Sequence, residues 1–157
     1  MAKNVNRTRR WVLLGGGAVL AGGLAVRHYR LTPPDYAGGQ LSVDEAHQQA
    51  GSGEVLLVDI RTPKEWRATG VGQGAYPLDM RRDDFIQALD QITEGNRDIP
   101  VALICARGVR SARLSNRLTE IGFTNVIDVP EGMLGSAAGP GWIRAGLPVQ
   151  EYDGRTG

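Results

Sequence analysis

Cysteine and histidine are the scarcest reactive residues in this 157-residue sequence. Its only cysteine is Cys105, so the chain cannot form an internal disulfide. Its two histidines are His28, near the start, and His47, which we expect at the surface of an early helix. Neither is expected to take part in catalysis, so any chemistry at Cys105 must proceed without a histidine base. The sequence also shows no internal repeat and no low-complexity tract.

Acidic residues are absent from residues 1–30, which carry six basic ones. The remaining residues carry twelve basic and seventeen acidic side chains, a formal charge of −5. A folded part this acidic is a poor ligand for a phosphate backbone, so we expect no nucleic-acid partner. The apolar content of 41% excludes a disordered chain. The length fits one domain with an appendage.

The basic start is followed by an apolar, glycine-rich run at residues 12–26, which is shorter than the ~20 apolar residues of a comfortable membrane span. A basic start before an apolar run is typical of targeting segments. The pair Arg9-Arg10 is similar to a twin-arginine export signal. We therefore expect residues 1–30 to be an export signal or a membrane anchor, with residues 11–26 in contact with the bacterial inner membrane. Both alternatives place the folded part in the periplasm.

Beyond a linker at residues 31–40, which contains Pro33-Pro34 and Gly38-Gly39, predicted helices and strands alternate to about residue 150. Because the strands are apolar on both faces, we expect a single α/β domain at 41–150 with a central parallel sheet and helices on both faces, followed by a tail at 151–157. Helices are predicted to begin after the capping residues Ser42, Thr62, Asp83 or Asp84, and Ser111, with a last short helix around Trp142. Strands are predicted at 54–60, 75–78, 100–104 and 125–129.

Cys105 stands where the strand at 100–104 ends, shortly before the helix expected at 111–121. Ligands of parallel sheets bind beyond the carboxyl ends of the strands. A short loop there directs backbone N–H groups and a helix dipole at one point, which makes an anion cradle. Arg107 and Arg110 add positive charge and favour the nucleophilic thiolate. The alternative is that Cys105 is a small buried hydrophobe.

The segment Cys-Ala-Arg-Gly-Val-Arg-Ser at 105–111 resembles the active-site loop C-R-S-G-x-R-S of rhodanese-like domains. Residues 58–66 resemble the family's D-V-R-x-x-x-E segment, and residues 70–78 its G-H-I-x-G-A segment. Gly132, Trp142 and residues 146–149 resemble the closing G-x-x-x-W-x-x-x-G-x-P-V pattern, with extra residues inserted. Four segments in the family's order cover roughly residues 40 to 150.

This resemblance implies a sulfurtransferase in which Cys105 takes a sulfane sulfur from an anionic donor such as thiosulfate. The covalent persulfide then passes its sulfur to a thiol, cyanide or protein acceptor, with no metal and no separate cofactor. Arg110 is expected to shape the loop and contact substrate, and Arg107 to face the pocket mouth. The remaining substrate-binding residues are expected to be Ala106, Gly108, Val109 and Ser111, with Asp59 and Arg61 in supporting, mainly structural roles.

Two departures from the family pattern leave the donor open. Val71 replaces the usual histidine, and Ala106 replaces the common arginine or glutamine after the cysteine. The spacing from Cys105 to Arg110 is C-x4-R, one residue shorter than in the related phosphatases, so a phosphatase or arsenate reductase is disfavoured. A sulfur carrier or protein-binding module without turnover remains an alternative. Trp66 and Trp142 are expected in the core or pocket wall.

Overall fold

The computed structural model describes residues 26–29 and 31–154 and divides the chain into two units, residues 1–33 and 34–157. In the first unit, residues 26–29 are helical, and the Thr32 N–H donates to the His28 carbonyl over 2.9 Å. No helix in the described ranges is long and apolar enough to cross a membrane. The apolar run predicted to contact a membrane lies almost wholly outside these ranges.

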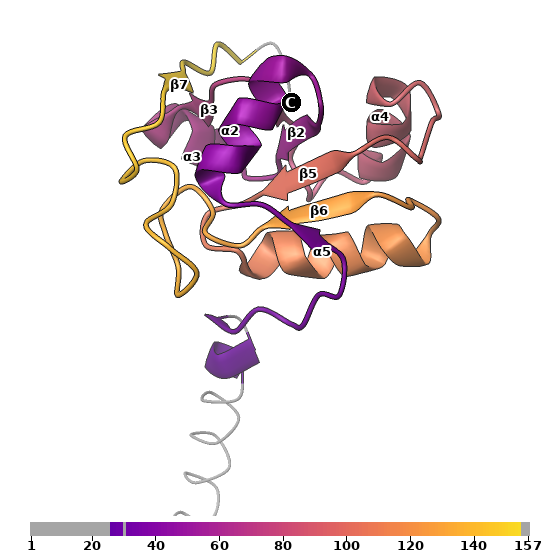
Figure 1. Cartoon of the computed structure of the whole chain (residues 1–157), viewed down its shortest axis with the longest axis horizontal. Coiled ribbons are helices and arrows are strands. Elements are labelled where there is room, and N and C mark those ends of the chain that lie inside the picture. The colour runs from indigo at the N-terminus through magenta and orange to yellow at the C-terminus, as the bar shows by residue number, and fades with distance from the viewer. Residues whose placement is uncertain (1–25, 30, 155–157) are drawn as a thin grey trace, which may run out of the picture. The chain divides into compact units, whose positions relative to one another are not determined.

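The second unit is built on a five-stranded sheet (Figure 1). Its strands are β1 (Gly39–Gln40), β2 (Leu56–Asp59), β4 (Tyr76–Pro77), β5 (Val101–Ile104) and β6 (Val126–Val129). They lie in the order β1-β6-β5-β2-β4, and every neighbouring pair is parallel. All five strands therefore end at the same edge of the sheet, which is where a ligand site is expected.

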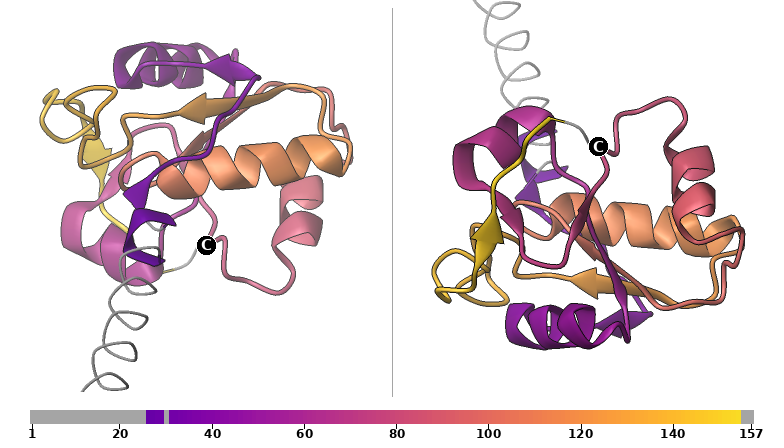
Figure 2. Two further views of the ribbon diagram at one scale, coloured as in Figure 1. Left: turned by 90° about the horizontal axis from the view of Figure 1, so that it is seen from below. Right: turned by 90° about the horizontal axis from the view of Figure 1, so that it is seen from above.

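Helices cover both faces of this sheet, as predicted. In Figure 2, α2 (Val43–Ser52, purple) and α5 (Val109–Glu120, orange) lie on opposite sides of β6. One core joins α2 and α3 (Pro63–Thr69) to the sheet, and the other joins α4 (Phe85–Ile92) and α5 to it. Alternate residues of β5 enter the two cores, because successive strand side chains point to opposite faces. This explains why the strands are apolar throughout.

Both predicted capping boxes are present. The Ser42 hydroxyl accepts from the Glu45 N–H and the Glu45 carboxylate accepts from the Ser42 N–H; Thr62 and Glu65 repeat this arrangement at the start of α3. The helix α2 runs on through Gly51 and Ser52 before Gly53 ends it in the left-handed conformation. Helix starts are therefore set by side chains only three residues away.

Two predicted helix details were wrong, and the predicted helix start at Asp84 holds without a side-chain cap. Gly108, not Ser111, occupies the N-cap of α5; Ser111 lies inside the first turn, and its hydroxyl donates to the Gly108 carbonyl over 3.1 Å. Asp84 occupies the N-cap of α4 but makes no side-chain cap, because its carboxylate binds Arg82. Trp142 is buried in a series of turns rather than a helix.

Tertiary pairing also adds strands that the sequence pattern did not indicate. Gly39 and Gln40, expected in a linker, form β1 by pairing with Ile127 and Asp128. The strands β3 (Val71–Gly72) and β7 (Val149–Gln150) pair antiparallel in a separate small sheet. His47 is half-buried rather than at the surface, with its ring 5.3 Å from the Trp142 ring.

Candidate active site

Cys105 follows β5 directly at the carboxyl edge of the sheet, between the ends of β2 and β6. Cys105 is only 1% exposed and belongs to the hydrophobic core beneath α4 and α5. The thiol is thus shielded from solvent.

The loop from Ala106 to Gly108 leads into α5 with its backbone donors unused. Within residues 26–29 and 31–154, no protein group accepts a hydrogen bond from the backbone N–H groups of residues 106–111. Unpaired N–H groups at the start of a twelve-residue helix form a site suited to a negative charge. The structure therefore provides the donors that an anion cradle needs.

Two glycines allow the loop to lie against the end of β6. Gly108 has φ +79°, and a Cβ there would lie 2.2 Å from the Pro130 carbonyl oxygen. Gly132 has φ +67°, and a Cβ there would lie 2.7 Å from the Ala106 carbonyl. Only glycine fits both the left-handed conformation and the close approach.

The segment after β6 holds the loop by its backbone. The Met133 N–H donates to the Cys105 carbonyl over 2.8 Å, and the Leu134 N–H donates to the Ala106 carbonyl over 2.9 Å. Glu131, almost fully buried, accepts from the Val43 N–H over 3.2 Å and from the Gly141 N–H over 3.0 Å. The first two contacts hold the Cys105 loop, and Glu131 ties the segment after β6 to the start of α2 and to Gly141.

Arg110 extends from the first turn of α5 to Glu65 on α3. Its Nη1 donates to Oε2 over 3.0 Å and its Nη2 to Oε1 over 2.5 Å. Burial tends to raise the pKa of Glu65, but hydrogen bonds from Arg110 and Thr62 outweigh it and lower the pKa to about 2. Burial tends to lower the pKa of Arg110, yet its interactions with Glu65 and Cys105 raise it. Arg110 is therefore a charged group beside the thiol, with its own charge matched by Glu65.

Arg107 differs from Arg110 in its surroundings. Arg107 is exposed, and none of the ion pairs found in the described part of the chain involves it. Ala106 and Val109, also expected at the site, are half-buried in the same loop. Arg107 is thus the cation of this loop that remains available to a ligand.

Asp59 and Arg61 lie at the end of β2 but are buried rather than open to a crevice, 0% and 1% exposed. Arg61 Nε and Nη2 donate to the Asp59 carboxylate, and Nη1 and Nη2 also reach Thr69 Oγ1 and the Gly70 carbonyl, each over 2.7 Å. This pair ties β2 to the end of α3, which is a structural arrangement.

Three carboxylates near the loop were not predicted as site residues. Glu65 was assigned no role at the site, although its place in the D-V-R-x-x-x-E segment was a signal. Asp128 lies inside β6 and is only 1% exposed. A single acidic residue in an otherwise apolar strand was a sequence signal for a buried carboxyl group. The role of Glu131 has no local sequence signal, because its partners are ten and 88 residues away.

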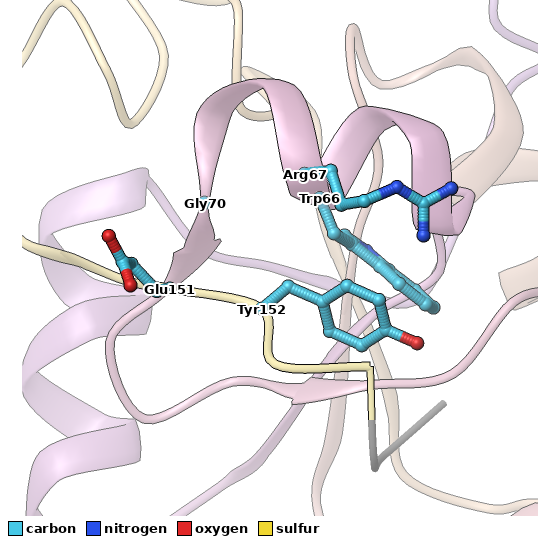
Figure 3. Close-up of a pocket in the computed structure, with 5 residues that line it drawn as sticks. All are labelled: Trp66, Arg67, Gly70, Glu151 and Tyr152. Carbon is cyan, nitrogen blue, oxygen red and sulfur yellow. The ribbon is translucent and has the colours of Figure 1, made fainter.

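A hollow of about 160 Å³ lies between α3 and the C-terminal segment (Figure 3). Its lining residues are Trp66, Arg67, Gly70, Glu151 and Tyr152. The Trp66 and Tyr152 rings lie side by side, with their centroids 5.0 Å apart. Among the residues that the structure describes, no cluster of three or more histidine, cysteine or acidic side chains is placed to hold a metal ion.

The chain is similar in sequence to several curated proteins, among them a sulfurtransferase and a tRNA hydroxylase. A protein named sulfurtransferase from Allochromatium vinosum is 30% identical over 105 residues, covering 67% of this chain and 87% of the relative. A tRNA uridine(34) hydroxylase from Photorhabdus laumondii is 27% identical over 120 residues, covering 74% of this chain but only 33% of that enzyme.

Among solved structures, the polysulfide-sulfur transferase homodimer of Wolinella succinogenes superposes with a TM-score of 0.57. The match covers 90% of this chain and 96% of that one at 20% identity, so it establishes a shared fold. The family model described as rhodanese-like domain matches residues 42–138, which contain the Cys105 loop, Glu65 and the strands that position them. The chain belongs to the rhodanese-like domain family.

Proposed function

We propose that this protein is a sulfurtransferase that moves a sulfane sulfur from an anionic donor, such as thiosulfate, to a thiophilic acceptor through a persulfide on Cys105. The observation that carries the proposal is the position of Cys105 at the end of β5, directly before a loop and helix start whose backbone N–H groups have no acceptor in the described part of the chain. Membership of the rhodanese-like family and the sulfurtransferase relative support it.

The reaction has two displacement steps. The Cys105 thiolate attacks the outer sulfur of thiosulfate, the S–S bond of the donor breaks, and sulfite leaves with the bonding electron pair. The product is a Cys105 persulfide anion. A nucleophilic acceptor then attacks the outer persulfide sulfur, and the Cys105 thiolate leaves. No net oxidation occurs, because the sulfane sulfur passes between two nucleophiles.

The chain's own residues support each step by charge. The backbone N–H groups of residues 106–111, which have no acceptor among the described residues, stabilise the negative charge of the terminal persulfide sulfur. Arg107, exposed and outside the ion pairs described above, binds the anionic donor at the mouth. Arg110 keeps α5 and the loop in place through its ion pair with Glu65, and its guanidinium lies beside Cys105.

Intact mass spectrometry of the reduced protein after mixing with thiosulfate tests this proposal. We expect a gain of one sulfur atom that cyanide removes, and no gain in Cys105→Ser. Polysulfide and cysteine persulfide serve as further donors in the same assay. If the folded protein with a free thiol takes sulfur from none of these donors, the proposal is wrong.

A sulfur carrier that delivers to a partner protein is the second candidate. Leu134 and Ile143 are 38% and 39% exposed, and the Leu134 N–H binds the Ala106 carbonyl at the loop. An apolar rim beside the thiol suits a protein acceptor more than a small anion. Persulfide formation without turnover by cyanide or small thiols would support the carrier over the enzyme.

We also propose that residues 1–30 direct the protein to the periplasm or hold it at the inner membrane. The basic start, Arg9-Arg10 and the apolar run support this. In a bacterial host, we expect the full chain in the periplasmic or membrane fraction and an Arg9→Lys/Arg10→Lys variant retained in the cytoplasm. Equal distribution of the two proteins would contradict it.

A further inference from the structure

Two Asp-x-Arg segments follow neighbouring strands of the sheet and fold in the same way. Asp59 and Arg61 stand at the end of β2, and Asp79 and Arg81 come shortly after β4. In both segments, one carboxylate oxygen accepts from the arginine backbone N–H, over 3.1 and 3.0 Å, and from Nε, over 2.9 Å in each. Nη2 donates to the other oxygen over 2.7 and 2.6 Å. Each guanidinium therefore has one edge occupied by its own aspartate.

The two segments differ at the outer edge of the guanidinium, which is formed by Nη1 and Nη2. In Arg61 that edge is filled, because Nη1 donates to Thr69 Oγ1 and Nη2 to the Gly70 carbonyl, both over 2.7 Å. In Arg81, Nη1 meets no acceptor in the described part of the chain, and the side chain is 66% exposed. The Asp79 side chain, only 10% exposed, still holds this guanidinium in one orientation. Arg81 is thus fixed without using its outer edge.

Backbone hydrogen bonds place Arg81 at the same edge of the sheet as Cys105. The Met80 N–H donates to the Ile60 carbonyl over 3.4 Å, and the Ile60 N–H donates to the Ile104 carbonyl over 3.0 Å. Met80 and Ile104 therefore lie on segments that are two strand spacings apart, ~10 Å. Because Arg81 is folded back onto its own aspartate, its guanidinium stays with the segment after β4.

Charge also links Arg81 to the ion pair beside the cysteine loop. The hydrogen bond and charge of Asp79 raise the pKa of Arg81, the Glu65 carboxylate adds to that rise, and Arg110 opposes it. Arg81 is therefore within electrostatic range of both members of that pair. It adds an exposed cation across β2 from Arg107, which lies in the loop itself.

We propose that the outer edge of Arg81 binds the carboxylate of a small thiol whose sulfur meets Cys105, so that Arg81 selects carboxylate-bearing thiols as sulfur acceptors. The inference rests on the proposed sulfurtransferase function and names its acceptor class. In the transfer, the acceptor thiolate attacks the outer persulfide sulfur, the S–S bond to Cys105 breaks, and the Cys105 thiolate leaves. The acceptor is released as its own persulfide.

Distance and geometry together select this class of substrate. The oxygens of thiosulfate are only two bonds from its outer sulfur, so this donor does not span from Cys105 to Arg81, and a polysulfide carries no oxygen. A thiol with a carboxylate several bonds from its sulfur does span the gap. The two carboxylate oxygens match the two donors of the outer edge, as the oxygens of Thr69 and Gly70 match those of Arg61.

Binding of S-methylglutathione to the full-length protein tests the proposal without any sulfur transfer. This probe has the carboxylates of a peptide thiol but no free thiol. NMR titration gives its Kd for the wild type, Arg81→Gln, Arg81→Lys and the matched control Arg82→Gln. Arg82 is also exposed and paired with an aspartate, Asp84, and its replacement changes the net charge equally. We expect Arg81→Gln to weaken binding about tenfold, the scale of a charge-assisted hydrogen bond, and Arg82→Gln to leave it unchanged.

The lysine variant separates charge from geometry. Lysine keeps the charge of Arg81 but has no planar fork, so we expect Arg81→Lys to bind about as weakly as Arg81→Gln. Full recovery of affinity in Arg81→Lys would overturn the two-pronged contact. Absence of binding by the wild type, or an equal loss in Arg82→Gln, would overturn the site itself. The same spectra show whether each variant is folded.

Discharge of the Cys105 persulfide tests the role of Arg81 in transfer. Protein loaded with thiosulfate is mixed with glutathione or with mercaptoethanol, which has no carboxylate, and the loss of sulfur is followed by intact mass. We expect the preference for glutathione over mercaptoethanol to fall about tenfold in Arg81→Gln and to stay constant in Arg82→Gln. An unaltered preference in Arg81→Gln overturns the proposal. If the wild type forms no persulfide, the sulfurtransferase function fails, whereas the binding measurement still decides whether Arg81 holds a carboxylate.

Discussion

Arg110 in the first turn of α5 and Glu65 at the start of α3 form a two-pronged ion pair, with Nη1 3.0 Å from Oε2 and Nη2 2.5 Å from Oε1. Glu65 also caps its own helix by accepting from the Thr62 N–H. One carboxylate therefore fixes the starts of two helices, which pack on opposite faces of the sheet. The loop that carries Cys105 lies directly before one of these starts.

Replacing Glu65 with glutamine should lower the free energy of unfolding at neutral pH by about 1 kcal/mol, the upper range for a partly exposed pair. The folded pKa of about 2 is below the ordinary 4.5, so the carboxylate's contribution is complete above about pH 4.5 and is lost as the pH falls toward 2. Urea unfolding from pH 7 to pH 2.5 measures this. If the difference in the free energy of unfolding between variant and wild type stays constant over that pH range, the lowered pKa of Glu65 is contradicted.

Arg107→Gln should weaken donor capture while leaving the fold intact. We expect kcat/KM for thiosulfate to fall about tenfold, the scale of one charged hydrogen bond, with the effect shrinking at high salt. Arg117→Gln, an exposed arginine in the last turn of α5, is the matched control and should leave kcat/KM unchanged. Equal losses in the two variants would show that only the net charge of the protein matters.

Gly108→Ala should destabilise the protein by about 2–4 kcal/mol, from left-handed strain and overpacking against Pro130. Gly51→Ala provides the contrast, because Gly51 lies inside α2 and a Cβ there meets no atom within 4 Å. That control should be neutral or slightly stabilising. Thermal unfolding of both variants measures the difference, and a harmless Gly108→Ala would mean that the loop geometry differs from the one described.

Asp59→Asn should cost about 3–5 kcal/mol, because it leaves the guanidinium of Arg61 buried without its counter-ion. The exposed pair of Arg82 and Asp84 allows a comparison, since Asp84→Asn should cost much less than Asp59→Asn. Denaturant midpoints of the two variants provide the measurement. Similar small costs for both would show that the buried pair is dispensable.

Asp128→Asn should make the protein relatively more stable as the pH rises. The folded pKa of Asp128 is raised from 3.8 to about 6, so the wild type loses stability as the pH increases between these values. The variant has no such titration, and the gain reaches at most roughly 3 kcal/mol above about pH 7. Chemical denaturation at pH 4.5 and pH 7.5 measures it; a gap that narrows with pH would refute the raised pKa.

Much of this protein was determined by short-range features of its sequence. Both capping boxes hold because their partners are three residues apart, and β5 was predictable because Val101–Ile104 is apolar on both faces. The position of Cys105 at the sheet edge followed from the end of that strand and the helix pattern after it. The roles of the individual site residues remain predictions.

Other features were decided only by the tertiary structure, because they join distant segments. Gly39 and Gln40 are strand residues only because β6 offers them free backbone groups, and Arg110 meets Glu65 across 45 residues. The N-cap of α5 is Gly108 rather than the predicted Ser111, because this position lies against the Pro130 carbonyl, where no side chain fits. Local sequence specifies which residues can form a helix or a strand. Which residues hold Cys105 in place is decided by close contacts between backbone segments that are far apart in the sequence.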